Sequence, residues 1–145
     1  MRASFAAAAV LLIALSGFAS SSSDAPKIDI RLAQTSMPVD TFYFRGPVSL
    51  QYQLTIANPT SQQVTLRRLD LSTVGPGAYS LRTGATPITR TIRPNGTTTI
   101  TLSTWGRASG GDLRSEEPVT VRGIAYFDTP NGRGFVRQFI ETFNP

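Results

Sequence analysis

The chain contains no cysteine and no histidine among its 145 residues. Without these side chains it can form no disulfide, no Ser-His-Asp or Cys-His nucleophilic system, and no zinc site of the usual nitrogen and sulfur type. Lysine is nearly absent, because Lys27 is the only one and the other basic side chains are arginines. The formal charge of +5 is modest and spread along the chain, so nucleic acid is not an expected partner.

Long apolar runs are absent except near the N-terminus. Arg2 is followed by an apolar stretch from Ala3 to Leu15, after which the chain becomes small and polar. This pattern is typical of a signal peptide, and the stretch is shorter than the roughly 20 residues of a membrane-spanning helix. Small residues favour cleavage after Ala19 or Ser21.

We therefore interpret residues 1–21 as a signal peptide, residues 22–26 as a polar tether, and residues 27–145 as a single domain. A bacterial lipoprotein signal would need a cysteine for lipid attachment, and the chain has none. We expect an exported product, periplasmic or secreted, that is not a lipoprotein and has no transmembrane segment after cleavage.

The main pattern of residues 27–145 is an alternation of apolar and polar residues, which predicts β-strands with one buried face. The alternation is clearest from Pro47 to Ala57, where one face carries Val48, Leu50, Tyr52, Leu54 and Ile56. We expect these apolar side chains to lie in the core. Further strands are predicted at residues 28–32, 64–71, 79–82, 88–92, 97–105, 119–127 and 135–143.

Seven or eight short strands without an amphipathic helix predict an all-β fold, an immunoglobulin- or fibronectin-III-like sandwich of antiparallel strands. A small closed barrel is the alternative. The alternation changes parity at Arg67-Arg68 and again at Gly123, and each change predicts a β-bulge. Residues 37–46 are irregular, with aromatic side chains that we expect to pack against an edge of the core. Phe135, Phe139 and Phe143 alternate with Val136 and Ile140, so both faces of the last strand are expected to be partly covered.

Side chains suited to catalysis are few. The acids Asp112, Glu116 and Glu117 lie in one loop, but no spacing marks two of them as a catalytic pair. We expect no enzyme, no cofactor and no metal site. Arg67 and Arg68 are either solvent-facing residues of a bulge or contacts for an anion such as a phosphate or sugar acid. Trp105 is either an exposed binding residue or the end of the core.

Three segments resemble group 2 of the late embryogenesis abundant proteins (LEA-2), also called the WHy domain. They are Leu54–Pro59, which ends in Asn58-Pro59, then Ile92–Leu102, and Val121–Phe127 followed by Phe135-Val136. The resemblance implies a sandwich in a non-enzymatic, stress-linked protein without catalytic residues. The family-like residues Asn58, Pro59 and Gly123 are then structural.

Two functions remain open. The first, which follows from the resemblance, is an extracytoplasmic domain that protects client proteins or membranes during drying, cold or salt stress. The alternative is an interaction module that binds a partner protein, a glycan or a cell-envelope component through its loops or a sheet edge.

Overall fold

A computed structural model describes residues 25–36, 45–82, 84–111 and 116–144. Eight strands form two four-stranded antiparallel sheets, with the order β1-β2-β6-β4 in sheet A and β5-β3-β7-β8 in sheet B. The strands are β1 (Asp29–Ser36), β2 (Arg45–Asn58), β3 (Val64–Val74), β4 (Tyr79–Leu81), β5 (Gly84–Ile92), β6 (Gly96–Ser109), β7 (Val119–Asp128) and β8 (Gly134–Phe143).

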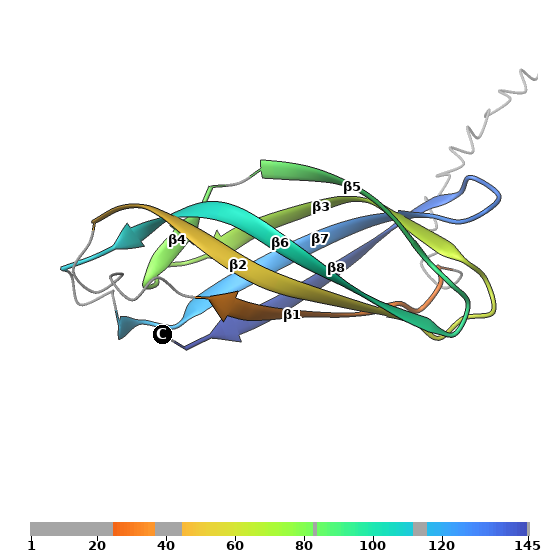
Figure 1. The fold of residues 1–145 in the computed structure, drawn as a ribbon, viewed down its shortest axis with the longest axis horizontal. Helices are drawn as coiled ribbons and strands as arrows, with labels where there is room; N and C mark the ends of the chain where they lie inside the picture. The colour runs from red at the N-terminus through yellow and green to blue at the C-terminus, as the bar shows by residue number, and fades with distance from the viewer. Residues whose placement is uncertain (1–24, 37–44, 83, 112–115, 145) are drawn as a thin grey trace, which may run out of the picture.

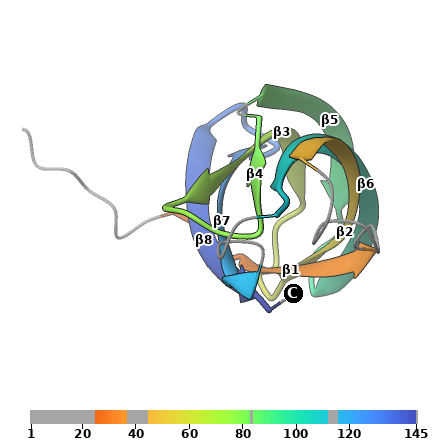
Figure 2. The same cartoon turned by 90° about the vertical axis from the view of Figure 1, so that its left-hand side faces the viewer.

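The two sheets face each other as a sandwich (Figures 1 and 2). Within them, β1-β2-β6 follow the order of strands A, B and E of an immunoglobulin-type sandwich, and β3-β7-β8 follow that of strands C, F and G. The predicted all-β sandwich is therefore confirmed, and the strands lie close to the predicted ranges. Within the described ranges, no helix is long and apolar enough to cross a membrane.

The core forms where the inner faces of the sheets meet. On β2, Leu50, Tyr52, Leu54 and Ile56 are fully buried, which confirms the predicted core face of this strand. Sheet B supplies the opposing side chains, including the buried Leu66, Leu69, Val121 and Phe127. The period-two pattern thus places one face of each central strand in the interior.

The two parity changes have different causes. The pairing of β3 with both neighbours shifts between Leu66 and Arg68, so the predicted bulge at Arg67-Arg68 is confirmed. The predicted bulge at Gly123 is wrong, because β7 pairs with β3 and β8 in regular register there. Gly123 itself points inward, and Ile124 and Tyr126 are half-buried residues of the outer face.

Gly123 is glycine because an aromatic ring covers its α-carbon. It pairs with Phe139 of β8, and a β-carbon at position 123 would lie 2.0 Å from Cζ of that ring. We expect Gly123→Ala to lower the free energy of unfolding by about 1–3 kcal/mol, as overpacking does. Gly84→Ala is the matched control, because its β-carbon would come no closer than 3.9 Å to another atom. Urea unfolding of both variants checks this, and equal stabilities would contradict the packing role.

The expectations for β8 are only partly confirmed. Val136 and Ile140 on the outer face of β8 are 44% and 60% exposed. The prediction that this face is partly covered is therefore wrong for the described part of the chain. Phe135, Phe139 and Phe143 do pack against the core. The proposed signal peptide and the aromatic residues between 37 and 44 lie outside the described residues.

Two tyrosine hydroxyls meet in the core. Tyr52 Oη lies 2.7 Å from Tyr79 Oη, and Tyr79 donates to Oε1 of Gln34 at 2.7 Å. Burial is the main cause that raises the pKa of both hydroxyls above the ordinary value of 10.0. Because the folded state keeps these protons where the unfolded chain loses them, stability is fully present below about pH 10 and falls above it.

This pH dependence is testable by urea unfolding between about pH 8 and pH 11. The parent should lose stability above about pH 10, and the variant Tyr52→Phe/Tyr79→Phe should lose less over the same range. Equal losses in the two proteins would show that other groups cause the alkaline destabilisation.

Candidate functional site

Asn58, the last residue of β2, joins two turns from inside the fold. It is 1% exposed and is the only buried polar residue among those described. Its Nδ2 donates to the carbonyl oxygens of Gln62 at 2.7 Å and Arg93 at 3.1 Å. Its Oδ1 accepts from the backbone N–H of Thr60 at 3.1 Å and from the Thr60 hydroxyl at 2.7 Å.

These bonds hold the β2–β3 turn against the β5–β6 turn. A backbone bond from Asn95 to the Thr60 carbonyl, 3.1 Å, adds to the same contact. Asn95 has a φ of 51°, a left-handed conformation that asparagine tolerates better than most residues. Pro59 is exposed beside this junction. Asn58 is thus part of the fold's hydrogen bonding, with both ends of its amide already satisfied.

Arg67 and Arg68 point outward from the bulge of β3. Nε of Arg67 lies 2.8 Å from Asp128, and Arg68 makes two bonds to Asp70, of 2.7 and 2.5 Å. The hydrogen bonds from Arg68 hold the pKa of the Asp70 carboxyl below its ordinary value. The guanidinium of Arg68 also lies 4.8 Å from the ring centre of Tyr126. The anion contact stays a prediction, and an anion there would compete with these carboxylates.

On the outer face of sheet A, the two central strands β2 and β6 carry a continuous surface of uncharged polar side chains. The alternation that buries one face of β2 and β6 turns hydroxyl and amide side chains outward on the other, and the pairing sets Gln53 opposite Thr101 and Thr55 opposite Thr99. We call this surface the polar face, and it comprises Ser49, Gln51, Gln53, Thr55, Thr97, Thr99, Thr101 and Ser103.

A groove lies at one end of the polar face. Trp105 is 63% exposed and pairs with Ser49, so it continues the row of outward side chains on β6. The groove, of about 650 Å³, is called the tryptophan groove below and is lined by Arg45, Gly46, Pro47, Ser80, Leu81, Arg82, Trp105, Gly106 and Arg107. Three of the lining residues are arginines, so its surroundings are cationic.

Gly106 shapes this groove by letting β4 approach β6. A β-carbon at this position would lie 2.8 Å from the Ser80 carbonyl and 2.9 Å from Cδ1 of Leu50. Sequence reasoning left Trp105 open and did not find the arginines, because Arg45, Arg82 and Arg107 come from three separate segments. The Trp105-x-Arg107 spacing could have indicated that these two share a face.

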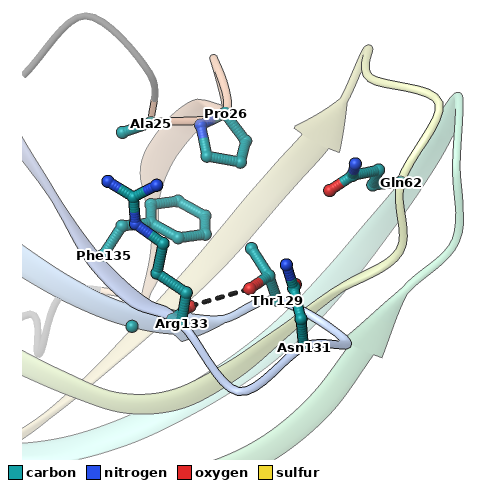
Figure 3. A pocket seen from close by; sticks show the side chains of 8 residues that line it. Ala25, Pro26, Gln62, Thr129, Asn131, Arg133 and Phe135 are labelled. Carbon is teal, nitrogen blue, oxygen red and sulfur yellow. Dashed lines mark hydrogen bonds between the residues drawn. The ribbon is translucent and has the colours of Figure 1, made fainter.

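A smaller polar hollow, of about 380 Å³, lies where the β7–β8 turn meets the start of the described chain. Figure 3 shows Arg133, Phe135 and Pro26 around it, with the Thr129 hydroxyl bonded to the Arg133 carbonyl at 2.9 Å. Of the loop acids considered above, Asp112 lies outside the described residues. The backbone carbonyl of Glu117 accepts a hydrogen bond from the backbone N–H of Ala78 at 3.1 Å. Neither Glu116 nor Glu117 lines the hollow.

The fold is similar to those of solved structures with little sequence identity. One is the solution structure of a protein described as late embryogenesis abundant (LEA), with 13% identity, a TM-score of 0.51, and coverage of 88% of this chain and 77% of that one. Another is the ApaA protein of Bordetella pertussis, with 15% identity, a TM-score of 0.49, and coverage of 82% and 90%. A FixG-related protein of Vibrio parahaemolyticus has 16% identity, a TM-score of 0.41, and coverage of 81% and 94%.

No protein-family model matches the chain, and neither does any curated protein sequence. Identities this low show a shared fold only. The solved LEA protein and this chain therefore have the same class of β-sandwich in common.

Proposed function

We propose that the protein is an exported, non-enzymatic protective domain of the LEA-2 type, which acts on its clients through the polar face of sheet A. The observation that carries the proposal is this continuous surface of hydroxyls and amides on two paired central strands. The clients are proteins or membranes that lose their hydration during drying, cold or salt stress.

The chemistry of the polar face suits this task. Hydroxyl and amide groups both donate and accept hydrogen bonds, so they can replace water molecules at a client surface. Uncharged groups cost less to desolvate than charged ones, which lets the contact form when water is withdrawn. The strands hold these groups in place, so little conformational entropy is lost on contact.

Two further features support the proposal. The fold is shared with a protein described as LEA, which supports the proposal by analogy. The N-terminal sequence favours export, which would place the domain where it meets drying and salt directly. Mass spectrometry of periplasmic or secreted material tests the export: a mature N-terminus at Ser20 or Ser22 supports it, and a retained residue 1 contradicts it.

Protection is tested by drying a desiccation-sensitive dehydrogenase with and without the protein and measuring the activity after rehydration. We expect recovery well above that of the enzyme alone and above that with an equal mass of an unrelated immunoglobulin-like domain. Recovery no better than with the unrelated domain would contradict the proposal.

The tryptophan groove favours a second function, the binding of an acidic glycan of the cell envelope. An exposed aromatic ring offers a surface for a sugar ring, and Arg82 and Arg107 beside it can pair with carboxylates. Because Trp105 is the only tryptophan of the chain, its fluorescence reports on this groove alone.

The second function is tested by titration with polygalacturonate, with dextran as the neutral control. Binding predicts a saturable change in tryptophan fluorescence with the acidic polymer only, weakened by salt and by Arg82→Gln/Arg107→Gln. An unchanged emission with both polymers would exclude this function for the groove.

A further inference from the structure

Strand β8 is an edge strand of sheet B. Its ladder is with β7, and β1 of the other sheet lies beside its free side (Figures 1 and 2). Among the described residues, no backbone hydrogen bond joins β8 to β1. A row of N–H and C=O groups along this 10-residue strand therefore has no ladder partner within the sheet.

Three devices that often protect a sheet edge, namely proline, lysine and a β-bulge, are missing from β8. The strand from Gly134 to Phe143 contains no proline and no lysine, and its register with β7 shows no shift. Its outward side chains include Val136 and Ile140, which are 44% and 60% exposed. A long, regular edge with exposed apolar side chains is a template for pairing with another strand.

The opposite face of β8 carries one side chain of each charge. Nη2 of Arg137 donates to the carbonyl of Ala25 at 3.0 Å and to that of Pro26, while its buried Nε has no hydrogen-bond partner. The ion pairs found among the described residues join Arg67 to Asp128 and Arg68 to Asp70. Neither Arg137 nor Glu141 belongs to an ion pair within the described ranges.

We propose that β8 pairs antiparallel with β8 of a second copy of this chain, around a two-fold axis at Phe139. Arg137 and Glu141 each lie two residues from Phe139, on either side of it. In this register Arg137 of each copy faces Glu141 of the other, so the interface contains the same ion pair twice. Because β8 is complementary to itself in charge, we identify the strand that pairs with it as β8 of a second copy.

The same register covers the exposed apolar side chains. Ile140 comes to lie opposite the second copy's residue 138 and diagonal to its residues 136 and 140, within the reach of cross-strand neighbours. The groove of about 550 Å³ between β1 and β8, which Ile28, Ile30 and Phe139 help to line, leaves space for inward side chains of the second copy. Sheet B then continues across the axis into the second copy.

The proposal is tested by reversing each charge alone and then mixing the two variants. In Arg137→Glu the paired positions are both acidic, and in Glu141→Arg they are both basic, so each variant repels itself. Mixed together, the variants present opposite charges at both pairs. We expect a dimer for the parent, a roughly tenfold or greater weakening for each variant alone, and heterodimers in the mixture.

Sedimentation velocity gives the affinities, and native mass spectrometry separates the heterodimer from either homodimer by mass. Arg90→Glu on β5, the far edge of sheet B, is the matched control and should dimerise like the parent. Thermal melting verifies that each variant is folded, and Ile140→Lys gives a second test that leaves the bonds of Arg137 intact. A parent that stays monomeric at about 100 µM, or variants that dimerise as the parent does, would overturn the proposal. So would a mixture without heterodimers.

Discussion

Replacing Asn58 with alanine is expected to lower the free energy of unfolding by about 3 kcal/mol. A single buried polar group left without its partner costs about 1–3 kcal/mol, and this substitution leaves several at once. The Thr60 N–H and the carbonyls of Gln62 and Arg93 all lose their bond to the Asn58 amide. Urea unfolding followed by circular dichroism measures the change.

Pro59→Ala is the control, because Pro59 is exposed next to Asn58. It should cost under about 1 kcal/mol, the usual effect of changing chain flexibility at a turn. Protection of a client should be the same for both variants below their melting temperatures. A folded Asn58→Ala protein without protective activity would instead place this residue in a binding site.

Replacing Leu54 with alanine is expected to cost about 2–5 kcal/mol, the range measured for truncating buried leucines. Leu54 is fully buried at the middle of β2 and belongs to the cluster that joins the two sheets. The side chain is lost from a packed interior, so a cavity adds to the loss of transfer free energy. The shift of the urea midpoint at constant slope measures it.

Gln53→Ala is the matched control, one residue away on the polar face. It should change stability by less than about 0.5 kcal/mol. A large loss in this variant, together with an unchanged Leu54→Ala protein, would mean that the two faces of β2 are assigned the wrong way round.

The sequence was sufficient to predict most strands, because apolar and polar residues alternate along them. The alternation is clearest in β2, where each buried residue is followed by a more exposed one. It misplaced a bulge at Gly123, where Ile124 and Tyr126 sit half-buried on the outer face and imitate a change of parity. A glycine that makes room for Phe139 cannot be distinguished by period alone, since the ring comes from the neighbouring strand. Burial on both sides of a strand weakens any prediction from alternation.

The candidate sites were harder to predict for a different reason. Asn58 was recognised as a turn residue, but its bonds reach Arg93, which is 35 positions away, and such a contact has no local signal. The polar face was visible only as two separate alternating segments. Its continuity depends on the pairing of β2 with β6, which the sequence does not specify.

The central claim is that protection resides in the polar face, and two matched pairs of substitutions test it. Thr55→Val/Thr99→Val removes two hydroxyls that face each other on sheet A, and Thr65→Val/Thr91→Val removes a facing pair on sheet B. Valine keeps the shape and the strand preference of threonine, so both variants should stay folded.

The deciding measurement is the client activity recovered after drying with each variant. The account predicts that the sheet A variant loses protection toward the level of the client alone, while the sheet B variant protects like the parent. Equal protection by the two variants would contradict it.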